Sequence, residues 1–333
     1  MMTEEMDIGR RVLDHLFDQM MIDEEWSVRD SNSFTWWGHR LAQKVWFDPP
    51  VEEAGFEITR VHAETQLLKD VPETEEIAKK ISAFNCYASL SALIWYPEKG
   101  EINYRCSAYF HHQTIGWLLK VFMSAVALQA ADAQIKVNHG LGDLLGGVPN
   151  ESAPPGRESR PDMDNMLDII EQMYAPEGAG ESPWRKKDFA NVLAMDPNPW
   201  VVASEGRNAM TAEFPFYGDR PAVMGACETA LLQATAEEKH PQLGSGLLLR
   251  ITLPPIGVEA TADLACQLNS DEAGEWSRSH MLGAWCIGDM GITFVSFIPA
   301  ALYRERLLDT MILSMAMRAR WAKEYTDRLV EKG

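Results

Sequence analysis

The chain has 333 residues, which is enough for two domains that each bury a core of their own. A hydrophobic content of 46% and a charged content of 24% are typical of a globular protein. The net charge of −19 argues against nucleic acid and membrane surfaces as partners, and no apolar run is long enough to predict a transmembrane helix.

The first half of the chain, residues 1–137, predicts one α+β domain. Ile8, Val12 and Leu16 recur on one helical face, whereas residues 56–68 alternate in polarity as a strand does. The predicted order is α-β-β-β-α-β-β-α. In chain order, the elements are a helix over 6–21, strands over 34–38, 41–47 and 56–68, a helix over 72–84, strands over 89–96 and 102–110, and a helix over 114–135. Antiparallel hairpins with a helix at each end favour a sheet with one covered face.

Residues 138–160 are rich in glycine and proline, which predicts a linker. The second half, 161–333, repeats the predicted order with one addition, a helix inserted within 219–240. Its other predicted elements are helices over 163–174 and 188–195, a hairpin over 200–203 and 209–216, a strand over 247–253, a helix over 261–269, strands over 281–287 and 291–298, and a long helix from about residue 302.

The two halves match at low identity when the first is shifted by 190 positions. The shift places Trp95 on Trp285 and Ile102 on Ile292, and it keeps the order of strand, turn, strand and long helix. It also places Arg60 on Arg250, although the polar residues around these arginines differ. We therefore expect two tandem copies of one scaffold, with the candidate chemistry present in only one of them.

The segment Gly291–Tyr303 and the apolar helix 307–321 carry a resemblance to a known fold, together with their first-half counterparts 100–110 and 117–131. The pattern resembles class I type III secretion chaperones and the YbjN family of bacterial proteins. Such chaperones are typically small acidic homodimers that bind extended segments of client proteins. The resemblance implies that two copies in one chain form an intramolecular pseudo-dimer with a protein or peptide partner.

Three tryptophans in a predicted hairpin, Trp36, Trp37 and Trp46, are the first candidate binding site. Together with the neighbouring Arg60 and His62, they are suited to line a groove for a peptide or helix. The alternatives are that they anchor the core, or that the chain's own linker fills the groove.

The last helix is the second candidate binding site. Arg318 and Arg320 belong to a basic strip that suits an acidic partner segment. An ordinary solvated helix face is the alternative.

An enzyme is the competing function. His39, His62, Glu64 and His111 are the residue types used in acid–base catalysis or metal binding. The sequence has no catalytic signature, and its five cysteines lack the close-spaced pairs of a zinc site, so thiols in a reducing cytoplasm are expected. We therefore expect a cytoplasmic, non-enzymatic, chaperone-like or regulatory protein-binding module without metal or cofactor.

Overall fold

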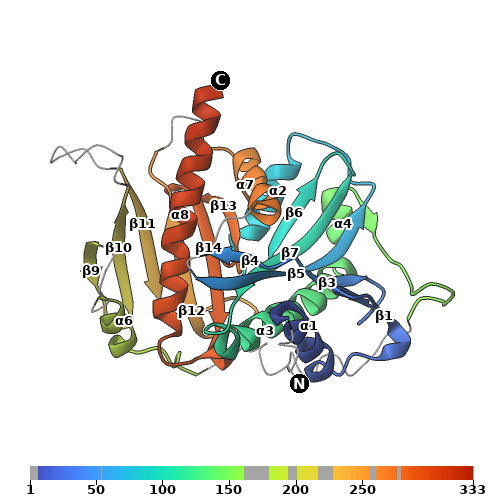
Figure 1. Ribbon diagram of the computed structural model, residues 1–333. Coiled ribbons are helices and arrows are strands. Elements are labelled where there is room, and N and C mark those ends of the chain that lie inside the picture. Colours follow the sequence, from blue (N-terminus) through green and yellow to red (C-terminus); the bar gives the residue numbers. More distant parts are fainter. Residues whose placement is uncertain are drawn as a thin grey trace, which may run out of the picture. The chain divides into compact units, whose positions relative to one another are not determined.

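The computed structural model forms two compact units (Figure 1). It describes residues 7–53, 55–160, 180–193, 201–216, 228–255, 260–275 and 279–332. Unit 1 comprises Met1–Ile77, Leu90–Ile170 and His280–Leu282, and unit 2 comprises Ala78–Ser89, Glu171–Ser279 and Gly283–Gly333. Each unit is built on an antiparallel sheet with helices, so the predicted α+β class is confirmed.

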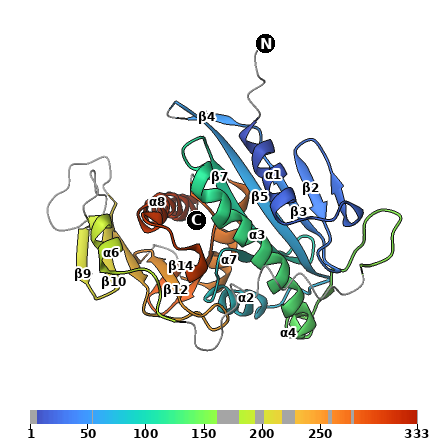
Figure 2. The same cartoon turned by 90° about the horizontal axis from the view of Figure 1, so that it is seen from below.

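The sheet of unit 1 has the strand order β1-β2-β3-β5-β7-β6, and β4 and β8 pair with β5 outside this path. The strands are β1 (Ser27–Arg29), β2 (Ser33–Trp36), β3 (Gln43–Phe47), β4 (Val51–Glu53), β5 (Phe56–Lys69), β6 (Ala92–Tyr96), β7 (Glu101–Phe110) and β8 (Val148–Pro149). Helices α1 (Ile8–Gln19) and α3 (Ile115–Asn138) cover one face (Figure 2). Val45, Ala63 and Cys106 face these helices and are buried, because side chains in paired strands alternate between the two faces.

Helix α3 is long and apolar enough to cross a membrane by length and composition alone. In the structure it packs against β5 and β7, and most of its apolar stretch is buried. It is therefore the core helix of unit 1.

The sheet of unit 2 has the strand order β13-β14-β12-β11-β10-β9. Its strands are β9 (Val201–Glu205), β10 (Ala209–Pro215), β11 (Thr229–Thr235), β12 (Gly246–Thr252), β13 (Ala284–Gly288) and β14 (Gly291–Pro299). Its helices include α2 (Ile77–Asn85), of which residues 78–85 belong to this unit, α6 (Lys186–Leu193), α7 (Ala262–Gly274) and α8 (Leu307–Lys332). Helix α8 lies against this sheet. The Arg318 guanidinium lies over the Phe294 ring of β14, and the Arg320 guanidinium lies over the Phe214 ring of β10.

The helix expected within 219–240 is wrong for the described part of that range, where β11 is a strand. Ala230, Leu232 and Ala234 are buried, whereas the residues between them are half exposed. This period of two belongs to a strand, and it overrides the helix propensity of alanine and leucine. Residues 217–227 and the helix expected over 163–174 lie outside the described residues.

Strand β11 completes the correspondence between the units, because it occupies the place that β3 has in unit 1. The cross-strand pairs nevertheless show that one constant shift does not relate the two sheets. Arg105 pairs with Glu64, whereas Val295, which lies 190 positions after Arg105, pairs with Arg250. The structural counterpart of Arg250 is therefore Glu64 and not Arg60.

Each unit contains a short segment from the other half of the chain. In unit 1, the Ser107 N–H donates to the Met281 carbonyl at 3.1 Å. In unit 2, the Phe297 N–H donates to the Ser89 carbonyl at 3.2 Å. Phe297 is the counterpart of Ser107, 190 positions later, and Met281 is the counterpart of Ser89, 192 positions later. The two offsets differ by two because the turn between β13 and β14 is two residues shorter than the turn between β6 and β7. The two exchanges are therefore equivalent.

The glycine- and proline-rich segment 138–160 has regular structure of its own. It contains α4 (Leu141–Leu145) and β8, whose residues Val148 and Pro149 pair with the end of β5. A Cβ atom on Gly147 would lie 2.6 Å from Val71 Cγ2, so only glycine fits this close approach. The segment therefore packs as part of unit 1, a result that composition alone does not predict.

Candidate functional site

The three tryptophans of the predicted groove do not share one face. Trp36 is 5% exposed and lies on the helix-covered side of the sheet, where its Nε1 donates to Gln43 Oε1 at 2.7 Å. Gln43 in turn donates to Gln129 Oε1 at 2.8 Å, which joins the indole to a buried polar network. Trp46 lies on the opposite side, because it pairs with His62. Trp36 is therefore a core residue in this structure.

Trp37 is 6% exposed and is held by the segment that the sequence predicts as a linker. Its Nε1 donates to Ser152 Oγ at 3.0 Å, and its carbonyl accepts a hydrogen bond from Arg160 Nη1 at 2.6 Å. These contacts favour the alternative in which the chain's own linker covers this end of the hairpin.

His62 lies in a stack on the second face of the sheet. Its ring is 4.8 Å from that of Trp46 at an interplanar angle of 14°, and its Nε2 is 2.8 Å from Asp48 Oδ2. Burial lowers the pKa of His62 to about 4, and the positive charges of Arg60 and Arg105 act in the same direction. The ring is therefore neutral at pH 7. The pKa of Asp48 is lowered although burial opposes this, because His62 hydrogen bonds to the carboxylate.

The other predicted residues of this face form separate pairs. Arg60 donates to Ser107 Oγ at 3.2 Å through Nη2, and its guanidinium lies 5.4 Å from the Tyr109 ring centroid. Glu64 Oε2 is 3.6 Å from Arg105 Nη1 and accepts a hydrogen bond from the Tyr96 hydroxyl.

The candidate enzyme residues do not come together as one site. His111 lies between β7 and α3, 5.2 Å from the Phe56 ring, and His39 lies between β2 and β3. Across the part of the chain that the structure describes, no group of three or more His, Cys, Asp or Glu residues is placed to hold a metal ion.

The basic strip predicted on the last helix divides between interior and surface. Arg318 is 1% exposed, and its Nε donates to Oε1 of the fully buried Glu272 at 2.9 Å. The same carboxylate accepts hydrogen bonds from Trp285 Nε1 at 2.8 Å and from Ser279 Oγ at 3.0 Å. Arg318 therefore neutralises a buried charge and is not available on the helix surface.

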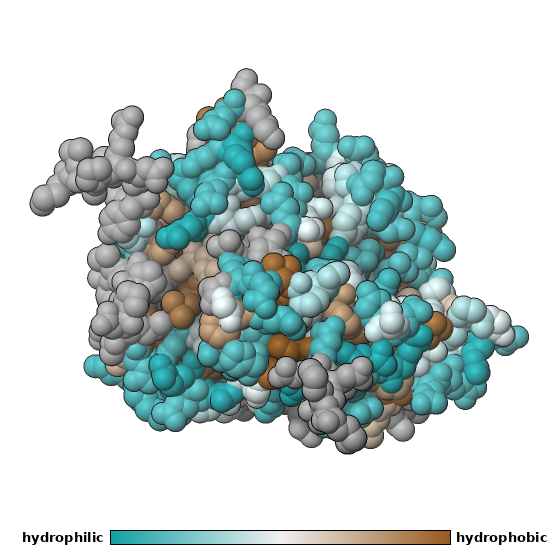
Figure 3. Space-filling model, viewed as in Figure 1, coloured by the Kyte–Doolittle hydropathy of each residue, from teal (hydrophilic) through white to brown (hydrophobic). Residues whose placement is uncertain are grey.

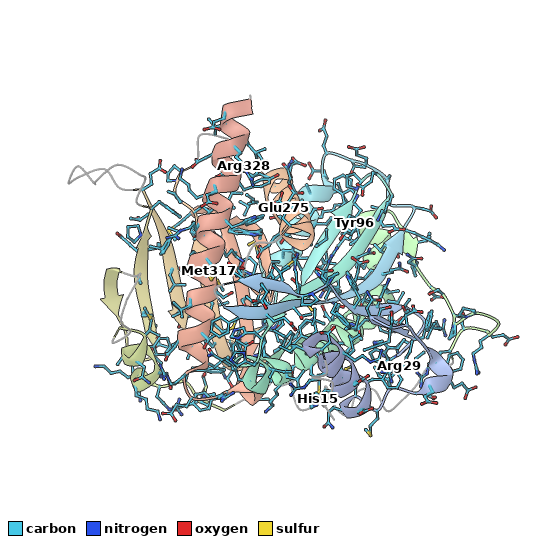
Figure 4. The ribbon with its side chains drawn as sticks, in the orientation of Figure 1. His15, Arg29, Tyr96, Glu275, Met317 and Arg328 are labelled. Atoms are coloured by element: carbon cyan, nitrogen blue, oxygen red, sulfur yellow. The ribbon has the colours of Figure 1, made fainter. Side chains whose placement is uncertain are left out.

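Arg320 is exposed, as is Met317 on the same helix (Figure 4). Near the end of α8, Arg328 lies 3.8 Å from Glu275 between Nη2 and Oε2. Glu324 and Asp327 are also exposed on α8, so the charges along its outward side are mixed in sign, which is typical of a solvated helix face. Most of the molecular face seen in Figure 3 is likewise hydrophilic.

The strongest candidate site is an open pocket of about 820 Å³ on the second face of the sheet in unit 2. Strand pairing brings Thr211, Gln233 and Arg250 into one row across β10, β11 and β12. A neighbouring row contains Thr252, Thr293 and Cys286. All six of these side chains line the pocket.

Two large exposed side chains also line this pocket. Tyr87, in the segment that follows α2, is 65% exposed, and Met290, in the turn between β13 and β14, is 56% exposed. Arg250 is neutralised by Glu238, to which its two terminal nitrogens donate at 2.9 Å each. The pocket therefore combines uncharged hydrogen-bonding groups with exposed apolar ones, and the Asp289 carboxylate also lines it.

The sequence reasoning missed this pocket for two reasons. The sequence predicts a helix at Gln233, and a helix there would not place this side chain in the row between Thr211 and Arg250. The alternation of Ala230, Leu232 and Ala234 could have identified the strand. No local signal places Cys86 and Tyr87 in unit 2, because they reach it only through the exchange of residues 78–89.

No protein-family model, curated protein or solved structure matches this chain significantly.

Proposed function

We propose that this protein is a non-enzymatic, chaperone-like or regulatory protein-binding module of the cytoplasm, and that it binds an extended segment of a partner protein in the pocket of unit 2. The observation that carries the proposal is the open sheet face with Tyr87 and Met290 exposed beside it. Solvent-exposed aromatic and methionine side chains at a concave surface are typical of adaptable binding sites.

The chemistry of the pocket floor favours a polypeptide. Thr211 and Gln233 can each donate and accept hydrogen bonds, as the alternating N–H and C=O groups of an extended backbone require, whereas the hydroxyls of Thr252 and Thr293 already hydrogen bond to each other at 3.0 Å. Among the described residues that line the pocket, Arg250 is the one cation, and its pairing with Glu238 disfavours an anionic small molecule. Side-chain selectivity would then come mainly from Tyr87 and Met290.

The common strand order and the equivalent exchanges support a pseudo-dimeric arrangement of the two copies. The copies differ at the proposed site. The row that holds Gln233, Arg250 and Val295 in unit 2 holds Lys44, Glu64 and Arg105 in unit 1. The unit 1 row is occupied by its own ion pair, so we expect one binding site in each chain.

The test begins with a random library of displayed peptides selected on the immobilised full-length protein. A selected peptide, labelled with a fluorophore, is then titrated with the protein and followed by fluorescence anisotropy. The double variant Tyr87→Ala, Met290→Ala should raise the dissociation constant about tenfold or more, because truncating two anchor residues costs on the order of 2 kcal/mol.

The control variants remove other exposed apolar side chains, from unit 1. Met21 is 78% exposed and Leu144 is 48% exposed, and neither lines the pocket. Met21→Ala and Leu144→Ala should bind as the wild type does. Equal binding by the pocket variant, or a library that yields no binding peptide, would contradict the proposal.

A further inference from the structure

Two cysteines from opposite halves of the chain lie together in unit 2. Cys86 directly follows α2, and Cys286 is the central residue of β13. Cys86 Sγ lies 3.4 Å from the carbonyl oxygen of Ile287, the residue that follows Cys286, and a thiol–thiol hydrogen bond shifts the pKa of both cysteines. Cys86 is half-buried and Cys286 is 1% exposed, and both line the open pocket. One thiol is therefore partly accessible from the pocket, and the second is a buried neighbour.

The surroundings make Cys86 the more acidic thiol of the pair. The hydrogen bond from Cys286 lowers the pKa of Cys86, and the positive charge of Arg250 lowers it further against the opposing effects of burial and Asp289. The same hydrogen bond and burial raise the pKa of Cys286. At neutral pH the accessible sulfur is thus the one with thiolate character.

The other two described cysteines provide an internal comparison. Cys106 and Cys266 are buried in the interior, and burial raises the pKa of each thiol to about 12. For both of these thiols, the described groups that shift the pKa include no second cysteine. They should react slowly with any oxidant that acts on thiolates.

We propose that Cys86 and Cys286 are a redox-reactive dithiol that hydrogen peroxide closes to a disulfide. The Cys86 thiolate attacks one peroxide oxygen, so that an S–O bond forms, the O–O bond breaks and water leaves after proton uptake. Cys286 then attacks the resulting sulfenic acid: the S–S bond forms, the S–O bond breaks, and hydroxide leaves as water with the Cys286 proton. Two thiols lose two electrons to one peroxide, and a dithiol reductant reverses the change.

Closure of this disulfide would link the exchanged segment 78–89 covalently to β13. It would also reposition one wall of the pocket next to Tyr87. The effect on partner binding rests on the proposed function, whereas formation of the disulfide does not, so the two are measured separately.

The experiment uses the full-length protein with Cys227→Ser, because Cys227 lies outside the described residues. Trypsin places each of the remaining cysteines on a separate peptide, since Lys80, Arg105, Arg250 and Arg278 each precede one of them in the sequence. After brief peroxide treatment and alkylation, mass spectrometry should show the Cys86 and Cys286 peptides joined. The mass of the joined product should be two hydrogens less than the sum of the two reduced peptides. Cys106 and Cys266 should remain fully alkylated, and the oxidation of their thiols should be at least about tenfold slower than that of Cys86.

Single variants separate the two roles. In Cys286→Ser, Cys86 should accumulate as a sulfenic acid that dimedone traps, whereas in Cys86→Ser, Cys286 should stay reduced. Sulfinic acid at Cys86 without a disulfide in the parent protein would overturn the proposal. So would oxidation of Cys86 no faster than that of Cys106, or disulfides only between chains. Anisotropy with the selected peptide, before and after oxidation, then reports the effect on binding.

Discussion

The buried ion pair of unit 2 allows a direct test of whether Arg318 is structural. Arg318 is 1% exposed and Glu272 is fully buried, and their Nε and Oε1 atoms are 2.9 Å apart. Arg318→Ala would remove the guanidinium from a buried carboxylate that also accepts hydrogen bonds from Trp285 and Ser279. Breaking a buried pair from one side costs about 3–5 kcal/mol, to which the lost contact over the Phe294 ring adds.

Such a loss is a large fraction of the stability of an ordinary domain, which is about 5–15 kcal/mol. Urea unfolding measures the loss, and hydrogen exchange of peptides from α8 assigns the transition to unit 2. The matched control is Arg320→Ala, which removes an exposed arginine two residues away and should change stability by less than about 0.5 kcal/mol.

A double variant separates the charge effect from packing. Arg318→Met with Glu272→Gln removes both charges while keeping similar volumes, and it should be more stable than Arg318→Ala. A loss below about 1 kcal/mol for Arg318→Ala would refute the structural assignment. It would return Arg318 to the basic surface that the sequence predicts.

Two further predictions test the strand β11 and the stacked histidine. Leu232 is fully buried, whereas its neighbour Leu231 is half exposed. Leu232→Ala should therefore lower the free energy of unfolding by about 2–5 kcal/mol, and Leu231→Ala should lower it clearly less. Equal losses of this free energy in urea unfolding would argue against the strand. The pKa of His62 in the folded chain, about 4, lies below its ordinary 6.5. The unfolded chain therefore takes up the proton first as pH falls, and wild type should lose about 2 kcal/mol between pH 7.5 and about pH 5. His62→Gln should reduce this loss, and an unchanged pH dependence would show that His62 does not cause it.

Much of the secondary structure could be predicted because it has a local cause. The alternation of residues 56–68 and the turn sequence between residues 96 and 101 both specify strands that the structure contains. The segment Thr229–Thr235 differs from its predicted helix because its residues favour helix in isolation, whereas burial on one face of a sheet decides its conformation.

Arg318 could have been placed correctly from the sequence. It lies on the same helical stripe as Met311, Met315 and Ala322, all of which are buried. A lone arginine on such a stripe predicts a buried partner. The identity of that partner, Glu272, depends on tertiary packing and has no local signal.

The pocket could not be predicted because its walls come from segments far apart in the sequence. Residues 78–89 precede a strand of unit 1 but pack in unit 2, and nothing in their composition distinguishes the two outcomes. The tryptophans show the same limit. Their number indicates a cluster, but only the strand pairing places Trp36 and Trp46 on opposite faces.

Photo-cross-linking of the selected peptide tests the central claim most directly. A benzophenone group on the peptide reacts preferentially with methionine, and three exposed methionines mark three surfaces: Met290 the pocket, Met317 the outward side of α8, and Met21 the surface of unit 1. Mapping the cross-links by mass spectrometry should give Met290 as the main site. Cross-links at Met317 or Met21 without Met290 would contradict the pocket of unit 2 as the binding surface.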